Sequence, residues 1–354
     1  MSDFQFRRNN FDIIRLVAAL QVVIIHGYEH LGFNGNSAII KLIGAFPGVP
    51  IFFVVSGFLI SASYERSTSI KSYFKNRVLR IYPALWSCLL ISVITIFLFF
   101  KPETTFISFF SWIIAQLSIG QVYNPDFLRG YGVGVLNGSL WTIPIEIQFY
   151  ILLPLIYVIF KKVKDSNVFL ISAILILAIL NQLFNGQLLN ERTIMIKFIS
   201  ITVLPYLFLF LLGVFLEKNL VLVEKYLANK AKWYLLIYMT AVIVSYLIGI
   251  RYQGNHINPI SALLLSCLTI SAAYSKVDIF RNILKGNDIS YGVYIYHMVF
   301  INMLLHISTF EPIVNFIITF LLTTLFAYLS WKIVEEPTLA LKTFSIRDIP
   351  YSRT

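Results

Sequence analysis

Residues 11–31 read FDIIRLVAALQVVIIHGYEHL, a mostly apolar run that carries Asp12 and Arg15 near its start and His26 near its end. A run of about 20 apolar residues is long enough to cross the hydrocarbon core of a bilayer as a helix. No small-residue cleavage site follows it, so we interpret it as a retained helix and not as a signal peptide.

Runs of similar length and composition recur along the whole chain. They predict helices over residues 11–31, 43–62, 82–100, 141–160, 168–185, 197–216, 233–250, 257–275, 288–306 and 313–332. Of the 354 residues, 58% are hydrophobic and only 13% are charged, too few charges for the surface of a soluble protein of this size. The sequence therefore predicts an all-α integral membrane protein, a bundle of about ten transmembrane helices.

The basic residues are distributed by membrane side. A net charge of +11 would suit a nucleic-acid partner, but Lys and Arg cluster in short segments between the apolar runs. When alternate connecting segments are compared, most of the 28 basic residues fall on one side, and the side rich in positive charge is normally cytoplasmic. We therefore predict both termini in the cytoplasm, a multi-pass protein of the plasma or inner membrane, and no nucleic-acid partner.

The domain organisation is simple. One transmembrane domain is predicted over residues 1–342, with a short cytoplasmic tail over 343–354 and no appended soluble domain. In the longest outer segment, 101–140, the apolar stretch 106–119 fits an interfacial or re-entrant helix, or equally a short helix packed against the bundle. The Gly-rich part over 124–138 could line an outward-facing entrance.

Two other intramembrane features have ordinary explanations. Cys88 and Cys267 fall within predicted spans and are interpreted as buried thiols, since their spacing indicates neither a disulfide framework nor a metal site. Gly48 and Gly57 permit either close helix packing or a break that lines a cavity, and close packing is the simpler explanation.

Arg15 and His26 are ionisable residues inside the first predicted span. Their separation of 11 residues corresponds to about three helical turns, so both project from one face, ~16 Å apart along the axis. Ala18, Ala19 and Val22 lie between them and could leave a groove. Arg15 could instead snorkel to the interface while His26 satisfies a buried hydrogen bond. For His26 we favour function, because ionisable side chains are costly within a membrane and usually face a cavity or a partner.

Glu146 is the acidic counterpart in the fourth predicted span. It lies ~7 Å below the outer end of its helix, about the same depth as His26, so the two can meet if the helices are neighbours. A carboxylate beside a histidine suits general-base catalysis, although a purely structural pair is the alternative. Pro144 nearby would free a backbone carbonyl and open the helix toward a cavity.

A basic cluster stands at the inner end of the third predicted span. Arg77 and Arg80 are three residues apart and share a helix face. With Lys75 and Arg15 they could form a cationic bowl for a phosphorylated ligand from the cytoplasm. Topology alone would also supply such charges, and on spacing alone that explanation is the stronger one.

Six sequence elements, taken in order, resemble the acyltransferase-3 family of membrane-bound O-acyltransferases. They are Arg15 followed by ten residues and His26; FFVVSGFL at 52–59; RVLRIYP at 77–83; SLW at 139–141 with Glu146; SYGVY at 290–294 with His297; and EEP at 335–337. The resemblance covers roughly residues 11–337. Each element is weak alone, but six in order at these spacings make a specific pattern.

The resemblance implies a ten-helix core that takes an acyl group, commonly acetyl from acetyl-CoA, at the cytoplasmic face. Such proteins pass the group to a hydroxyl of a cell-envelope glycan, such as a lipopolysaccharide O-antigen, or of its lipid-linked precursor. Acetyl-CoA is then a donor substrate, and no tightly bound cofactor is expected. Many relatives append an outer esterase-like domain, and its absence from the predicted organisation favours direct transfer.

The same resemblance implies three groups of site residues. In the catalytic pair, His26 would be the base or acyl relay, and Glu146 would support either His26 or the acceptor. Arg15, Arg77 and Arg80 would bind the phosphates of the donor. Tyr291, His297 and Trp141 would contact the substrate. For His297 a hydrogen bond with Tyr294 is the ordinary alternative, because the two share a helix face.

Two other functions would also place polar residues within a membrane. A transporter of a polysaccharide intermediate or small solute more often shows two related halves with matching broken helices, and no such symmetry is visible in the sequence. A non-catalytic protein that keeps only the fold would have no need of Arg15, His26 and Glu146 together. Acyl transfer is therefore the favoured hypothesis.

Overall fold

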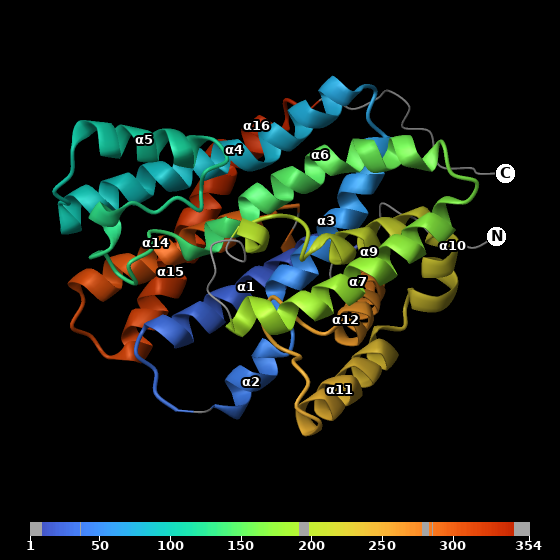
Figure 1. Ribbon diagram of the computed structural model, residues 1–354. Helices are drawn as coiled ribbons and strands as arrows, with labels where there is room; N and C mark the ends of the chain where they lie inside the picture. The colour runs from blue at the N-terminus through green and yellow to red at the C-terminus, as the bar shows by residue number, and fades with distance from the viewer. Residues whose placement is uncertain (1–8, 36, 191–197, 278–282, 285, 343–354) are drawn as a thin grey trace.

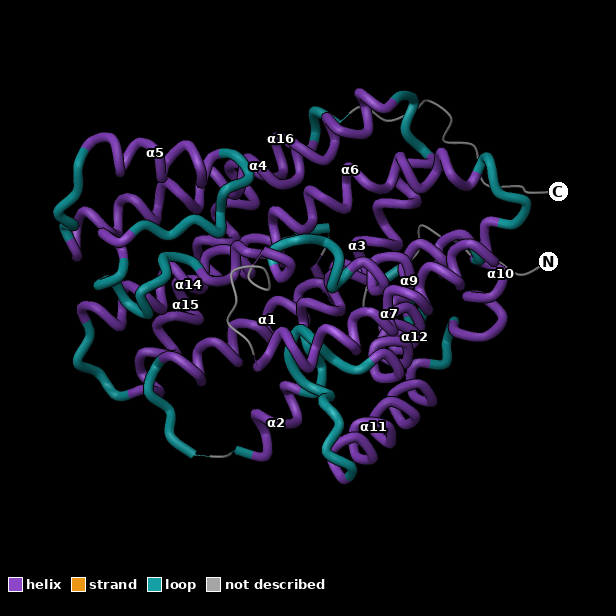
Figure 2. Tube along the Cα trace, viewed as in Figure 1, coloured by secondary structure: helices purple, strands orange, loops and turns teal. Residues whose placement is uncertain are grey.

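The described part of the protein consists of helices joined by loops. This computed structural model describes residues 9–35, 37–190, 198–277, 283–284 and 286–342, without the side chains of 184–190. Within these ranges the regular structure is helical and no strand is present (Figures 1 and 2). The predicted all-α class is confirmed for this part of the chain.

The helices fall into long and short elements. The long ones are α1 (Phe11–His30), α3 (Gly48–Glu65), α4 (Ile70–Thr95), α6 (Thr142–Phe160), α7 (Ser166–Asn190), α9 (Leu207–Lys218), α11 (Ala231–Leu247), α12 (Pro259–Ala273), α14 (Ser290–Ile307) and α15 (Pro312–Ser330). The remaining helices are α5 (Phe106–Leu117), which has 12 residues as α9 does, and the shorter α2 (Ala38–Gly44), α10 (Leu220–Leu222) and α16 (Glu336–Leu339). Single π-helical turns extend α4, α10 and α15 over Ile96–Phe100, Val223–Leu227 and Trp331–Glu335, and 3₁₀ turns occupy Asp126–Leu128 and Gly138–Trp141.

Each of the ten predicted spans overlaps one long helix. Among the described residues, six segments are long and apolar enough to cross a membrane by length and composition: Phe11–His30, Ala38–Glu65, Ile70–Phe100, Gly138–Phe160, Ser166–Leu183 and Pro312–Leu339. Helices α11 and α12 are apolar but shorter. The chain therefore has the character of a multi-pass membrane protein, while ten crossings remain a prediction.

Helix starts differ most from the predictions. The third helix was expected from residue 82 but begins at Ile70, where Ser69 accepts a hydrogen bond from Ser72 N and caps the helix. Pro83 lies inside this helix. The second begins at Gly48 instead of residue 43, because Pro47 takes an extended conformation as its N-cap.

Pro144 does not open its helix, contrary to the prediction. α6 begins at Thr142, so Pro144 lies in the first turn, where a backbone N–H has no partner within the helix in any case. The proline in the interior of α6 is Pro154.

Close packing at small residues holds the centre of the bundle together. α3 packs against α9 and α1, and α1 packs against α14 (Figure 1). A Cβ added at Gly57 would lie 2.0 Å from the carbonyl oxygen of Phe210, and one at Gly48 would lie 2.3 Å from that of Ala18. These contacts confirm the close-packing interpretation of both glycines. Cys88 is buried within this core and donates to the carbonyl of Ile295 at 3.3 Å.

The segment 101–140 forms a short helix and a folded loop. α5 runs beside α4 (Figure 1) and buries Trp112 completely, while Phe106 and Ile107 on its other side are about 80% exposed. The Gly-rich loop is anchored by Asn302 of α14, whose Oδ1 accepts from Val133 N at 2.8 Å. The helix is therefore packed against the bundle along one face only.

Candidate functional site

A cavity lies between five helices at the centre of the bundle. α1 contributes Arg15, α3 contributes Ser56, α4 contributes Arg80, α6 contributes Glu146 and α14 contributes Tyr291. The rest of the lining is Val49, Phe52, Phe53, Ile81, Thr142, Ile143, Ser290 and Tyr294. Its empty volume is about 640 Å³. The cavity therefore combines two cations and a carboxylate with a largely apolar and aromatic wall.

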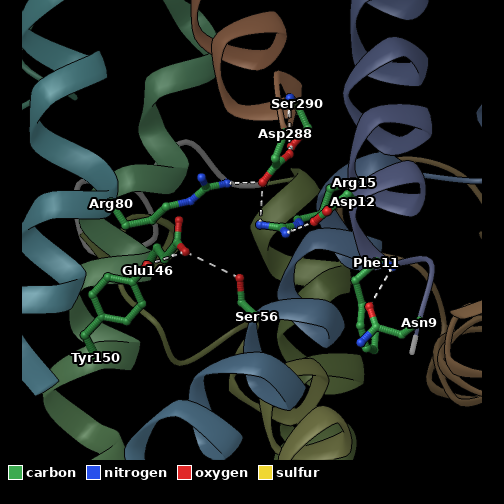
Figure 3. Close-up of polar contacts among 10 residues, drawn as sticks. All are labelled: Asn9, Phe11, Asp12, Arg15, Ser56, Arg80, Glu146, Tyr150, Asp288 and Ser290. Carbon is green, nitrogen blue, oxygen red and sulfur yellow. Dashed lines mark hydrogen bonds and ion pairs between the residues drawn. The ribbon is translucent and has the colours of Figure 1, made fainter. Parts of the chain in front are cut away.

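A buried carboxylate joins the two cations. Asp288 Oδ2 lies 2.9 Å from Arg15 Nη1 and 2.5 Å from Arg80 Nη2 (Figure 3). Arg15 also pairs with Asp12 one turn earlier on α1, at 2.6 Å. The two guanidinium groups, which come from different helices, are thus held side by side at one end of the cavity.

Asp288 did not figure among the predicted site residues. It precedes α14, and its Oδ1 accepts from Ser290 Oγ at 2.5 Å. Arg15 and Arg80 together compensate the charge of this buried carboxylate. An Asp two residues before the Ser that opens an apolar helix is a detectable helix-start signal, but it does not predict a partner on another helix.

Arg77 lies beside the cavity and not in its wall. Its Nη2 donates to Ser63 Oγ at 2.9 Å, and its guanidinium lies 5.9 Å and 5.7 Å from the ring centres of Tyr73 and Tyr150. Lys75 is exposed. Of the predicted cationic bowl, only Arg15 and Arg80 line the cavity.

Glu146 is held by α3 and by its own helix. Tyr150 donates to Glu146 Oε1 at 2.6 Å, and Ser56 donates to the same oxygen at 3.4 Å (Figure 3). The predicted pair between Glu146 and His26 is wrong. α6 turns its carboxylate toward α3 instead of α1.

His26 instead pairs with a second histidine. His26 Nδ1 lies 2.9 Å from His297 Nε2 of α14, and the ring centres are 5.1 Å apart. His26 is partly exposed, whereas His297 is fully buried. His30 lies one turn away on α1, with its ring centre 5.8 Å from that of His26.

Of the predicted substrate contacts, Tyr291 lies in the cavity wall and Trp141 lies outside it. Tyr291 lines the cavity and donates to the carbonyl of Ile81 at 3.3 Å. Trp141 packs against Tyr206 and is not part of the cavity wall. The alternative of a Tyr294–His297 side-chain hydrogen bond is not found, because the Tyr294 hydroxyl donates to the carbonyl of Ser139 at 2.9 Å.

Comparison with known families gives this arrangement its context. The model of the acyltransferase-3 domain family, described as an acyltransferase domain, matches residues 8–332. The chain belongs to this acyltransferase family. Membership makes the protein an acyltransferase and confirms the resemblance that the six sequence elements indicated.

Similar curated proteins cover nearly the whole of this acyltransferase. Nodulation protein 10 of Rhizobium leguminosarum bv. viciae is 32% identical over 95% of this chain and 94% of its own length. An O-acetyl transferase of Shigella phage Sf6 is 30% identical over 93% of this chain and 96% of its own length.

A longer relative shares only part of its length. O-acetyltransferase OatA of Staphylococcus aureus (strain NCTC 8325 / PS 47) is 27% identical over 92% of this chain, which spans 56% of that protein. No solved structure gives a significant match to this chain.

Proposed function

We propose that the protein is a membrane O-acyltransferase that takes an acetyl group from cytoplasmic acetyl-CoA and passes it to a hydroxyl of a cell-envelope glycan or a lipid-linked sugar precursor. The observation that carries the proposal is the cavity in which Arg15 and Arg80, from two different helices, lie side by side above an apolar wall. Paired guanidinium groups match phosphate geometry, and the apolar wall suits an acyl chain and its pantetheine arm.

Unused hydrogen-bond donors support a phosphate-bearing ligand at this place. Arg15 Nε and Arg77 Nε are buried and hydrogen-bond to no described residue. A buried polar atom without a partner is costly, and an anionic oxygen would satisfy it. We assign donor binding to Arg15, Arg77 and Arg80, with Arg77 acting from the rim.

His26 is the proposed general base. The acceptor hydroxyl gives its proton to His26 while its oxygen attacks the thioester carbonyl, and the C–S bond of the tetrahedral adduct then breaks. The proton leaves on the CoA sulfur, so the products are an ester and free CoA. Arg15 and His26 lie on one helix, ~16 Å apart along its axis, so a donor held at Arg15 must extend along α1 to reach His26.

We propose that Glu146 binds the acceptor and does not support His26. Its Oε1 is occupied by Tyr150 and Ser56, which leaves Oε2 to accept a hydrogen bond from a sugar hydroxyl. Tyr291 lines the same cavity. We keep Trp141 as a proposed acceptor contact outside the cavity.

Acetyl as the transferred group and oxygen as the acceptor atom are supported by relatives named O-acetyl transferase and O-acetyltransferase. Family membership also favours acyl transfer over the transporter alternative. The proposed acceptors include an O-antigen sugar and an exopolysaccharide. We propose a plasma or inner membrane location with both termini cytoplasmic and with no tightly bound cofactor.

Lysine substitutions test the donor site without removing its charge. Arg15→Lys and Arg80→Lys keep a cation for Asp288 but lose the planar fork that binds phosphate. We expect each substitution to raise KM for acetyl-CoA about tenfold, because one charge-assisted hydrogen bond to phosphate is lost. KM for the acceptor should stay unchanged. Arg129→Lys, at an exposed arginine of the outer loop, is the control. Unchanged KM for acetyl-CoA in both variants would refute donor binding at this cavity.

A further inference from the structure

The histidine pair between α1 and α14 defines which nitrogen of His26 is free. His26 Nδ1 and His297 Nε2 share one hydrogen bond of 2.9 Å, so one ring donates and the other accepts. Nε2 of His26 makes no hydrogen bond to any described residue, and His26 is partly exposed. The direction of the shared hydrogen bond therefore decides whether that free nitrogen carries a proton or a lone pair.

The surroundings of His297 determine that direction. His297 is fully buried, its Nδ1 makes no hydrogen bond to any described residue, and the polar groups near the ring are the backbone carbonyls of Val293 and Tyr294 in the preceding turn of α14. Carbonyl oxygens only accept hydrogen bonds, so the stable tautomer of His297 carries its proton on Nδ1. A neutral imidazole has one N–H, so Nε2 of His297 must accept from His26.

We infer that His297 is a positioning residue that holds His26 in the tautomer with its proton on Nδ1 and its lone pair on Nε2. The inference rests on the proposed function, in which His26 is the base. It replaces the earlier assignment of His297 as a substrate contact, since a side chain with no exposed surface, outside the cavity wall, cannot touch the acceptor.

The pair also suits the charge that develops during transfer. When His26 Nε2 takes the proton of the acceptor hydroxyl, the ring becomes an imidazolium whose Nδ1–H still donates to neutral His297. The pair then holds one added proton, which returns to the CoA sulfur when the C–S bond breaks. His297 thus stabilises the protonated base without giving up or taking a proton itself.

Two substitutions separate this role from simple packing. His297→Gln places an amide oxygen near the position of Nε2 and keeps an acceptor, whereas His297→Leu fills the space without one. We expect His297→Leu to lower kcat about 100-fold with KM for acetyl-CoA nearly unchanged, and His297→Gln to recover much of that loss. His306→Leu, at an exposed histidine near the end of the same helix, is the control.

The tautomer itself can be observed without any activity. Nitrogen-15 NMR of histidine-labelled protein in lipid nanodiscs distinguishes a protonated from an unprotonated ring nitrogen, with His26→Ala used to assign the signals. We expect His26 to be protonated on Nδ1 in the wild type and to shift toward protonation on Nε2 in His297→Leu. A wild-type His26 protonated on Nε2, or a His297→Leu variant with full kcat, would overturn the inference. Failure of the wild type to transfer any acyl group would instead overturn the proposed function, whatever the NMR result.

Discussion

At the scale of single residues, the protein itself supplies a carboxylate that pairs with two arginines of the proposed donor site. Asp288 is buried and bridges Arg15 and Arg80, so two cations that repel each other are brought to one place before any ligand arrives. The arrangement orients both guanidinium groups, and it leaves Arg15 Nε for another oxygen. Asp288 therefore fixes the positions of the two arginines, and its negative charge offsets part of their positive charge.

Asp288→Asn tests this organising role. Removing one charge from a buried ion network leaves the remaining charges uncompensated, which costs about 3 kcal/mol. We expect a lower Tm in detergent without donor, and a larger rise in Tm on adding CoA than the wild type shows, because the phosphate groups replace the lost carboxylate. An Asp288→Asn variant with unchanged Tm in both conditions would contradict this account.

Lys342 adds a titratable cation near the same arginines. Burial, together with the positive charges of Arg80, Arg77 and Arg15, lowers the pKa of Lys342 to about 7. Above that pH the free protein holds Lys342 mostly neutral. A bound phosphate would favour the charged form, so we expect donor binding at the proposed site to take up a proton and its affinity to fall as pH rises above about 7.

Calorimetry measures this proton uptake. At pH 8 we expect CoA binding to take up close to one proton, seen as different apparent heats in two buffers of different ionisation enthalpy. Lys342→Arg stays charged and should bind with the same heat in both buffers. Identical apparent heats of CoA binding to the wild type in the two buffers would show that Lys342 does not take up a proton when the donor binds.

The sequence predicted which residues form the candidate site better than it predicted which side chains contact each other. The spacing of Arg15 and His26 places both on one face of α1, and that follows from helix geometry alone. The pairing of Glu146 failed because equal depth in a membrane says nothing of which helices are neighbours or how each is rotated. His26 faces α14 and Glu146 faces α3, and only the packed bundle determines that.

At the scale of helices, the crossing of α3 and α9 depends on two glycines. A Cβ at Gly57 would lie 2.0 Å from the Phe210 carbonyl oxygen, and one at Gly213 would lie 2.2 Å from that of Val54. In both cases the obstacle is backbone, so a side chain could be accommodated only if the helices moved apart. Because Ser56 beside Gly57 contacts Glu146, such a movement would also disturb the cavity.

Gly57→Ala tests the importance of that contact. Overpacking of this kind costs about 1–3 kcal/mol, so we expect a lower Tm and a lower yield of folded protein. Gly138→Ala is the matched control, since no atom lies within 4 Å of the added Cβ and the backbone there is not left-handed. Equal Tm values for the two variants would mean that α3 and α9 are free to separate.

Helix boundaries show the limit of prediction at this scale. Apolar runs locate all ten long helices, because the length of an apolar run reflects the helix that it forms. The start of α4 was missed by 12 residues, since Ile70–Ile81 is amphipathic and carries several charges. A capping serine, and not apolarity, marks its beginning.

At the scale of the whole molecule, the fold places the proposed donor site and the proposed general base on a single helix. α1 carries Arg15 in the cavity and His26 at the histidine pair, and it packs against α3, which lines the cavity, and against α14, which contributes to both places. Between them, Phe52 of α3 and Tyr294 of α14 are in edge contact, with ring centres 5.4 Å apart, and Tyr294 in turn lies 6.2 Å from His297. A donor bound at the arginines would reach His26 past these rings.

Transfer of labelled acetyl groups tests the central claim most directly. Membranes that contain the wild type or His26→Ala, with each protein inserted in equal amount, are given radioactive acetyl-CoA, and envelope glycan and lipid-linked fractions are counted separately. The account predicts label in one of these fractions with the wild type and at least about a 100-fold loss with His26→Ala. Equal labelling by His26→Ala, or no label in any wild-type fraction with the native acceptor present, would contradict it.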